Sequence, residues 1–540
     1  MLTNFKELID AKGASLCDPI GFGKNKGKHL WQVPETYWQS LCTKNGIQYY
    51  VILDKIKEAK YHKQLLDSKA PRRGIVPEKI TEFLYPHQKE FILKLGDIPH
   101  SNLWAAIGTG KTYAYLELVK SKIRAGEKVL ILCPKTVFSS WNNAIKSYLG
   151  DKATFVNVKG MYQEKLQKLN YEKYFYITNY ESLLNKNILE ALKQKGFSFI
   201  VADEAHKYFS NTSTRTYKAA MDLSANIEIK HVLTGTPRRS KDENLYGLIT
   251  FLDRGERFGA SFYAFRKKYF VADYMGFSYD FNENLRKEFW DKIKSISYIV
   301  TKDVLNLPER TEQIIEIELT EEAAKHYADM HKDAMIEVDK YKNMQYSKVI
   351  APIAIAKITK LRQLCSGFVR DTEKNETIVF NQDKLIELDN ILNDISEPVI
   401  ITCCYTQEIE QISKLLKDKN LSFGVISGKI KDTERNIYID KFSKKELDTL
   451  IIQEDSGGVG IDGLQNHCSL MIRYSYGYSF DTDEQIIGRI ERSGQKKSMR
   501  VIRLKATING KETIENAIIG TIKNKCEGFE NLVKNIKENI

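Results

Sequence analysis

Short apolar runs and stretches of helical spacing alternate along two separate parts of the chain. In the first part, the apolar residues of 113–124 and 141–148 recur with helical spacing. Around these segments lie near-continuous, partly β-branched runs at 128–134, 174–180, 197–204 and 229–237. Strands of this kind are buried on both faces, so the pattern predicts a parallel sheet with helices packed on both sides.

The alternation resumes after a long, charged, aromatic-rich region of helical spacing, roughly 241–382, which contains one strand-like run at 311–319. Further apolar runs follow at 397–405, 421–428, 447–453, 469–474 and 499–504. The predicted fold class is α/β, with two tandem parallel-sheet lobes and a helical region between them. We place the boundaries at 1–80 (basic accessory domain), 81–250 (lobe 1), 251–382 (helical inter-lobe region), 383–510 (lobe 2) and 511–540 (closing Lys-rich helix).

Length, charge and composition limit the classes of protein to which this chain can belong. A chain of 540 residues is too long for one core, and its net charge of +12 favours a polyanionic partner such as nucleic acid. No apolar run is long enough to cross a bilayer, and acidic residues occupy the place of a signal-peptide core. We therefore expect a cytoplasmic protein without a membrane partner. The eight cysteines form no C-x-x-C pair, so buried free thiols are expected rather than zinc sites or disulfides.

The first eighty residues hold more basic than acidic groups. The segment 21–31 interleaves glycine, lysine and tryptophan and fits either a nucleic-acid contact or a solvated basic loop. Trp31, Tyr37 and Trp38 are expected to build a small core, and the Pro- and Arg-rich stretch 69–77 is expected to be a linker.

A candidate phosphate-binding loop follows the first apolar strand. The segment 103–118 passes from an apolar run through a turn into helical spacing, and its turn contains Gly108, Thr109, Gly110, Lys111 and Thr112. Glycines let backbone N–H groups surround a phosphate, and a helix N-terminus favours the same anion. Lys111 would neutralise the outer phosphates, and Thr112 would bind Mg²⁺. Ala105 stands where the full pattern has its first glycine, so a Gly-rich turn with a chance lysine is the alternative.

An acidic pair ends the strand 197–204, in the sequence Asp203-Glu204-Ala205-His206. Ligand chemistry collects at the carboxyl ends of parallel strands, which predicts that Asp203 binds Mg²⁺ with Thr112. Glu204 would orient or deprotonate the attacking water. The tetrapeptide 234–237, T-G-T-P, ends the next strand, where its hydroxyl groups can bond to the acidic pair.

Two arginines lie near the end of the second alternation, in Q-I-I-G-R-I-E-R-S-G-Q (485–495). Arg489 and Arg492 are three residues apart and would share one face of a helix. Two guanidinium groups there could stabilise charge on a transferring phosphoryl group, as an arginine finger does. Alternatively, they form surface ion pairs with Glu484 and Glu491.

The order G-T-G-K-T, D-E-A-H, T-G-T-P and Q-I-I-G-R-I-E-R-S-G-Q resembles the superfamily-two helicases. The last motif is most similar to the Swi/Snf-like branch of DNA-dependent ATPases. The resemblance implies two RecA-like lobes that bind ATP with Mg²⁺. It also assigns adenine recognition to Tyr85 and Gln88, nucleotide coupling to Gly460 and Asp462, and nucleic-acid contacts to Thr136, Thr178, Thr406 and Ser427.

The function implied is an ATP-dependent DNA translocase that tracks duplex DNA, usually as a monomer, to remodel DNA structures or displace proteins. Ala105, Ala106 and the variant G-V-G-I-D (458–462) depart from the branch pattern, and the short insertions resemble a compact viral, phage or bacterial member. Alternatives are a strand-separating DNA or RNA helicase, a nucleoside triphosphatase acting in transcription termination or repair, and a restriction-associated motor. A non-catalytic ATP-gated module is disfavoured by the intact Lys111, Glu204 and Arg489.

Overall fold

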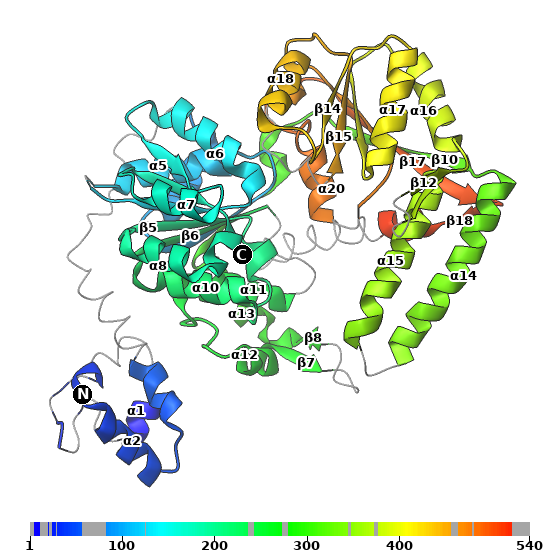
Figure 1. Ribbon diagram of the computed structural model, residues 1–540. Coiled ribbons are helices and arrows are strands. Elements are labelled where there is room, and N and C mark those ends of the chain that lie inside the picture. The colour runs from blue at the N-terminus through cyan, green and yellow to red at the C-terminus, as the bar shows by residue number, and fades with distance from the viewer. Residues whose placement is uncertain are drawn as a thin grey trace. The chain divides into compact units, whose positions relative to one another are not determined.

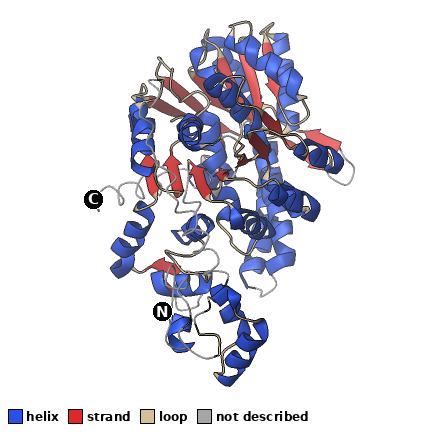
Figure 2. Ribbon diagram, turned by 90° about the vertical axis from the view of Figure 1, so that its left-hand side faces the viewer, coloured by secondary structure: helices blue, strands red, loops and turns tan. Residues whose placement is uncertain are grey.

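The computed structural model describes residues 5–10, 20, 24–26, 28, 30–56, 83–124, 126–235, 242–272, 279–343, 347–371, 376–454, 463–477 and 480–520. The chain divides into two compact units. Unit 1 comprises Met1–Trp104, Lys111–Pro134 and Ala144–Tyr298, and unit 2 comprises Ala105–Gly110, Lys135–Asn143 and Ile299–Ile540. One large sheet lies almost wholly in unit 1 and a second in unit 2; both are seen in Figure 1 and as red strands in Figure 2.

The first sheet has the strand order β3-β4-β2-β5-β6-β1-β9. Its strands are β1 (His100–Ala105), β2 (Val129–Leu132), β3 (Phe155–Asn157), β4 (Phe175–Thr178), β5 (Phe199–Asp203), β6 (Ile229–Thr234) and β9 (Ser297–Val300). The pairings among β1 to β6 are parallel. Every residue of β1, β2, β4, β5 and β6 is buried, so both faces of the sheet are covered, which confirms the prediction.

Helices alternate with these strands along the chain (Figure 1). They are α4 (Pro86–Leu95), α5 (Lys111–Lys122), α6 (Phe138–Ala144), α7 (Tyr162–Leu169), α8 (Lys186–Gln194), α9 (His206–Phe209), α10 (Arg215–Leu223) and α11 (Leu245–Asp253). Short 3-10 helices are η3 (Lys135–Val137), η5 (Tyr180–Leu184), η6 (Ser224–Asn226) and η7 (Asp242–Asn244), and η4 (Ile145–Leu149) is a π-helix that follows α6. Asn185 starts α8 because its side chain accepts the N–H groups of Asn187 and Ile188.

An aromatic cluster follows α11 and packs around Phe289, whose ring contacts those of Phe258, Tyr269 and Phe281. The elements here are α12 (Phe262–Tyr269), β7 (Phe270–Ala272), β8 (Tyr279–Phe281), η8 (Glu283–Leu285) and α13 (Arg286–Lys294). Next come η9 (Lys302–Leu305), β10 (Arg310–Glu318), α14 (Glu321–Asn343), α15 (Ser347–Cys365), β11 (Phe368–Asp371) and β12 (Glu376–Val379). α14 and α15 pack side by side, and β11 pairs antiparallel with β12.

The region 251–382, expected to be helical with one strand-like run, contributes strands to both large sheets. β9 is the last strand of the first sheet, and β10 is the first strand of the second. β10 pairs in parallel with β17 along its whole length, from Arg310 opposite Met499 to Glu318 opposite Thr507.

The second sheet has the order β10-β17-β16-β13-β15-β14, with β18 paired to β17. Its other strands are β13 (Val399–Cys403), β14 (Phe423–Ile426), β15 (Thr449–Gln453), β16 (Leu470–Arg473), β17 (Met499–Ile508) and β18 (Lys511–Glu512). The helices that accompany it are α16 (Asp383–Asp394), α17 (Thr406–Asp418), α18 (Asp432–Ser443), η10 (Leu464–Asn466) and α20 (Phe480–Ile487). Residues 511–512 form an antiparallel strand rather than the start of the closing helix; residues 514–520 are helical, and 521–540 lie outside the described residues.

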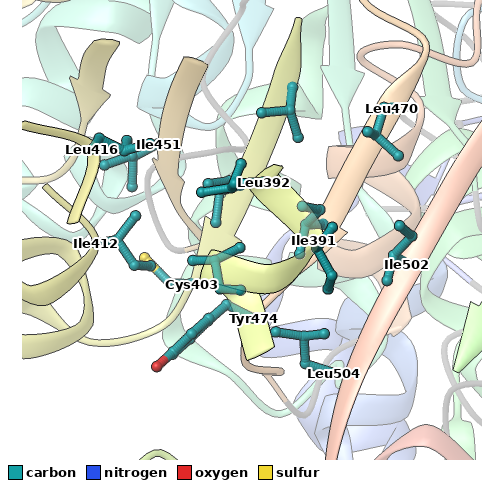
Figure 3. Packing of buried hydrophobic residues seen from close by; sticks show 14 of the residues in the cluster. Ile391, Leu392, Cys403, Ile412, Leu416, Ile451, Leu470, Tyr474, Ile502 and Leu504 are labelled. Carbon is teal, nitrogen blue, oxygen red and sulfur yellow. The ribbon is translucent and has the colours of Figure 1, made fainter. Parts of the chain in front are cut away.

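Alternate residues of each central strand face opposite sides of the second sheet. Ile401, Ile451 and Ile472 join a cluster with residues of α16 and α17, shown in Figure 3. Their neighbours Ile400, Leu450 and Met471 join a second cluster with residues of α18 and α20. This division is the period-two side-chain alternation of a strand covered on both faces.

The N-terminal residues form a small core of their own. The elements are α1 (Phe5–Asp10), η2 (Leu30–Gln32), α2 (Glu35–Lys44) and a helix over 49–56. Trp38 is fully buried there, and its ring N–H donates to the carbonyl of Leu30 at 3.3 Å. The basic segment 21–31 is described only in part, and the linker 69–77 lies outside the described residues. Within the described parts of the chain, no helix has both the length and the apolarity needed to cross a bilayer.

Candidate active site

The predicted phosphate loop joins β1 to α5. β1 ends at Ala105, and the N–H of Ala106 donates to the carbonyl of Val300 in β9 at 2.9 Å. Gly108 and Gly110 have φ angles of 86° and 79°, in the left-handed region that side chains disfavour. Because Ala105 is a strand residue, its position does not require glycine, which explains this departure from the usual motif.

The loop closes on itself before the helix begins. The hydroxyl of Thr109, a buried residue, donates to the carbonyl of Ala106 at 2.7 Å. α5 then starts at Lys111, followed by Thr112, so its first backbone N–H groups directly follow the two left-handed glycines. Two left-handed glycines, a helix N-terminus and a lysine together have a chemistry that fits a nucleotide phosphate chain.

Asp203 is the last residue of β5 and is 7% exposed. Its Oδ1 accepts the N–H of Glu204 at 3.0 Å, and its carbonyl accepts the hydroxyl of Tyr180 at 2.7 Å. Glu204 has a φ of 51°, a left-handed conformation that is costly for a residue with a side chain. Strain of this kind persists where surrounding contacts hold a residue for a function.

His206 links the acidic pair to β6, a role that the sequence interpretation did not assign to it. Its Nδ1 lies 2.7 Å from the hydroxyl oxygen of Thr234 and 3.5 Å from a carboxylate oxygen of Glu204. Thr234 therefore bonds to the imidazole, which in turn contacts the acidic pair. The only available signal was His206 as the final letter of D-E-A-H. Thr236 and Pro237 lie outside the described residues.

Strand register places these groups at one edge of the first sheet. Asp203 of β5 lies opposite Leu233 of β6, and Thr234 of β6 lies opposite Trp104 of β1. Trp104 directly precedes Ala105, the last residue of β1 before the phosphate loop. The carboxyl ends of β1, β5 and β6 are thus level. This edge is where open parallel sheets bind ligands.

The residues predicted to recognise adenine lie at the start of α4. Gln88 is 3% exposed, and its side-chain oxygen accepts the N–H of Tyr85 at 2.9 Å, which caps the helix. Tyr85 is 47% exposed and stacks in parallel with His87 at 5.8 Å between ring centroids. Gln88 thus has a structural contact in addition to the base-reading role predicted for it.

The prediction that Arg489 and Arg492 share a helix face is wrong. α20 ends at Ile487, and both arginines follow in a series of turns. The N–H of Glu491 donates to the carbonyl of Ile487 at 3.0 Å and holds these turns. Gly488 directly follows the helix, and glycine is a poor helix former.

Glu484 and Glu491, the alternative partners of the arginines, bind two other cations. Nζ of Lys302 lies 2.7 Å from Glu484 and 2.6 Å from Glu491. The Arg310 guanidinium lies 3.5 Å from Glu484 and 3.0 Å from Glu491. Each cation therefore contacts both carboxylates.

Residues 105–110 of the phosphate loop belong to unit 2, as do the arginines. A Cβ added to Gly108 would lie 3.0 Å from Cβ of Arg492 and 3.4 Å from the carbonyl oxygen of Glu491. A Cβ added to Gly488 would lie 2.5 Å from Cγ2 of Ile107. The absence of a side chain at both glycines permits this close approach.

The residues predicted to contact nucleic acid differ in accessibility. Thr136 in η3 and Thr406 at the start of α17 are partly exposed, whereas Ser427, just after β14, is 5% exposed. Thr178 is fully buried, and its hydroxyl donates to the carbonyl of Val158 at 3.3 Å. This placement does not support a phosphate contact by the Thr178 side chain. Gly460 and Asp462 lie outside the described residues.

Burial controls the protonation of two groups beside Asp203. It raises the pKa of the Cys133 thiol, and the nearby Asp203 carboxylate raises it further. Burial and Asp203 likewise raise the pKa of Tyr180. Both groups therefore stay neutral near pH 7, so Tyr180 can donate its hydroxyl hydrogen. Like Cys133, the described cysteines at positions 42, 365, 403 and 468 are buried free thiols.

Comparison with known proteins shows the family to which this chain belongs. Among curated proteins, the chain is similar to the DNA repair and recombination protein RAD54-like of Gallus gallus. That match is 23% identical over 510 residues and covers 83% of this chain and 68% of the relative. The chain is also similar to protein p41 of Acyrthosiphon pisum secondary endosymbiont phage 1, 25% identical over 436 residues and covering 75% of this chain and 88% of that protein.

A solved structure described as the Sulfolobus solfataricus SWI2/SNF2 ATPase core in complex with dsDNA matches 85% of this chain and 94% of its own, with 21% identity and a TM-score of 0.39. The family models that match are the SNF2-related domain over residues 92–367 and the helicase conserved C-terminal domain over residues 382–494. The chain therefore belongs to the SNF2-related family of superfamily-two DNA-dependent ATPases.

Proposed function

We propose that this protein is a motor that hydrolyses ATP when bound to duplex DNA and tracks along it, remodelling DNA structures or displacing bound proteins. The observation that carries the proposal is the common edge of β1, β5 and β6. There the register aligns Asp203 and Thr234 with the start of the phosphate loop. Such an edge provides phosphate-binding amides next to carboxylates, which is what phosphoryl transfer needs.

Each residue at this edge has a proposed role. The hydroxyl of Thr112 and the carboxylate of Asp203 are the hard oxygen ligands that Mg²⁺ prefers. Lys111 neutralises the outer phosphates. Glu204 orients the attacking water and accepts its proton as oxygen bonds to the γ-phosphorus and the bond to ADP breaks. Bound ATP would supply the phosphoryl group, and Mg²⁺ would neutralise part of its negative charge.

Two further groups complete the proposal. Arg489 and Arg492 stabilise negative charge on the transferring phosphoryl group, and the approach of Gly108 to Arg492 supports this assignment. Tyr85 and Gln88 contact the adenine, and the segment of Gly460 and Asp462 couples the nucleotide to the second sheet.

DNA as the partner is supported by the net charge of +12 and by the names of the relatives. Thr136, Thr406 and Ser427 are proposed to contact backbone phosphates. Contacts of this type carry little sequence information, so binding is expected to depend on salt more than on sequence. The motor is proposed to act as a monomer.

The test is the steady-state ATPase rate without polymer, with duplex DNA, with single-stranded DNA and with RNA, each at about 50 mM and about 200 mM salt. Strong stimulation by duplex DNA that weakens at the higher salt is the expected result. Stimulation only by single strands or RNA would replace the proposal with a strand-separating helicase. An unchanged rate with all three polymers would reject nucleic-acid-dependent hydrolysis by this chain.

A further inference from the structure

A chain of alternating charges runs through the second sheet to the segment that carries Arg489. Its buried end is Arg473, whose side chain is 1% exposed. The guanidinium donates to the hydroxyl of Thr402 at 2.9 Å and to carboxylate oxygens of Glu454 and Asp483, each at 2.5 Å. Asp483 lies on α20, so this end ties the helix to the end of β16.

The series of alternating charges continues from Asp483 towards the edge of the second sheet. Arg503 of β17 donates to both carboxylate oxygens of Asp483, at 3.2 and 3.0 Å, and to Glu312 of β10 at 3.0 Å. Burial opposes ionisation of Asp483, but Arg473 and Arg503 lower its pKa. Glu312 in turn lies 3.3 Å from Arg310, so the charges alternate without interruption.

Arg310 and Lys302 form the outer end, where each contacts both Glu484 and Glu491. The two carboxylates are only 11% and 12% exposed, whereas Lys302 and Arg310 are 29% and 23% exposed, so these ion pairs are partly shielded from water. Glu484 lies in α20, and Glu491 lies beyond its end. The two carboxylates therefore bracket the turn that contains Arg489, and the cations hold both sides of it.

Lys302 also follows closely a strand residue that is hydrogen-bonded to the phosphate loop. Its position is two residues after Val300, whose carbonyl accepts the N–H of Ala106 at the start of that loop. The turn 488–492 lies beyond α20, which ends at Ile487, and backbone hydrogen bonds such as that of the Glu491 N–H to the carbonyl of Ile487 hold its local conformation. Lys302 therefore adds a side-chain connection between the strand beside the loop and the two carboxylates that flank this turn.

We propose that Lys302 and Arg310 are positioning residues that hold Glu484 and Glu491 and so set the place of Arg489 for phosphoryl transfer. The proposal rests on the proposed function. Loss of both cations leaves two partly buried carboxylates without their ligands and lets the turn move. A displacement of about 1 Å at a catalytic group can lower turnover about 100-fold.

The test uses the full-length chain with Lys302→Gln, Arg310→Gln and the double substitution, and it measures DNA-stimulated kcat and the KM for ATP. The double variant is expected to lower kcat about tenfold to 100-fold with little change in KM. Lys302→Arg and Arg310→Lys keep the charges and should restore most of kcat. Arg500→Gln is the matched control, because it removes one cation from the exposed pair with Glu397 in the same unit.

A double-mutant cycle separates positioning from general destabilisation. In an Arg489→Ala background, the two Gln substitutions should lower kcat no further, since they act through Arg489. Additive losses would overturn the proposal. Normal turnover in Arg489→Ala itself would instead reject the proposed role of that arginine. If the double variant does not fold, the two single variants decide. Wild-type kcat in both would overturn the proposal. A lower kcat in either one, with no further loss when the same substitution is made in Arg489→Ala, would support it.

Discussion

The hydroxyl oxygen of Thr234 lies 2.7 Å from Nδ1 of His206, and both residues are buried at the carboxyl edge of the first sheet. Since the same imidazole nitrogen lies 3.5 Å from Glu204, the three side chains connect β6 to the acidic pair. A shift of β6 would therefore change the position of the carboxylate that is proposed to activate water.

Thr234→Val removes this hydroxyl with almost no change in volume. We expect the variant to lose most of the stimulation of its ATPase by DNA while keeping most of its basal ATPase rate. Its free energy of unfolding should fall by about 1–3 kcal/mol. The ratio of stimulated to basal rate measures the effect. Ser101→Ala is the control, because the Ser101 hydroxyl makes a similar 2.8 Å contact with His231 in the same sheet. A stimulation ratio equal in both variants would contradict a specific role for Thr234.

Gly108→Ala tests the close approach at the phosphate loop. The added methyl would lie 3.0 Å from Cβ of Arg492 and would sit on a residue with a φ of 86°. We expect ATPase activity to fall at least about 100-fold. Gly126→Ala is the matched control, since its φ is 85° but a Cβ there would meet no atom within 4 Å. The control should cost about 1–2 kcal/mol of stability and leave turnover intact.

Lys111→Ala removes the proposed charge on the outer phosphates. Hydrolysis should fall at least about 100-fold with and without DNA, because the lost cation stabilises charge in the transition state. Duplex binding, measured by fluorescence anisotropy, should stay within about twofold of wild type, since DNA binding rests on other contacts. Lys120→Ala, on the same helix and paired with Glu117, should keep wild-type turnover. Retained hydrolysis in Lys111→Ala would remove it from the proposed site.

Lys230 makes the stability of the first sheet depend on pH. Burial, with a smaller contribution from Arg254, lowers the pKa of Lys230 to about 7. Between about pH 7 and the ordinary lysine pKa of about 10.4, the unfolded chain binds the extra proton. The free energy of unfolding should therefore rise with pH in this range, by at most about 1.4 kcal/mol per unit. Lys230→Met should remove this contribution.

Urea unfolding at about pH 7, 8 and 9 measures the difference in slope between the two proteins. Trp104 and Trp290 are buried in unit 1 and report on it by fluorescence. Lys94→Met, at an exposed position of α4, is the control and should keep the wild-type slope. Equal slopes in Lys230→Met and wild type would show that Lys230 is protonated in the folded chain.

Much of the fold could be predicted because its causes are local. The apolar runs at 128–134 and 197–204 became β2 and β5, since burial on both faces demands near-continuous hydrophobicity. The turn of the candidate phosphate loop was equally evident from its glycines, because a positive φ is encoded at the residue itself. The small core around Trp38 followed from clustered aromatic residues.

Other features depended on contacts between residues far apart in sequence. β9 (S-Y-I-V) and the charged β10 are both partly exposed, so nothing local assigned them to different sheets. The two arginines had helical spacing, but the helix ended first, at Ile487. Thr178 had the residue type of a surface contact, yet its place at the end of β4 buried it.

By itself, the sequence determined the two α/β lobes, the glycine turn of the candidate phosphate loop, the acidic pair and the family to which they point, because each depends on neighbouring residues. Only the tertiary structure decided that His206 bonds to Thr234 and that Lys302 and Arg310 hold Glu484 and Glu491. Hydrogen bonds and ion pairs act over a few ångströms, and chain folding alone determines which distant residues come within that range.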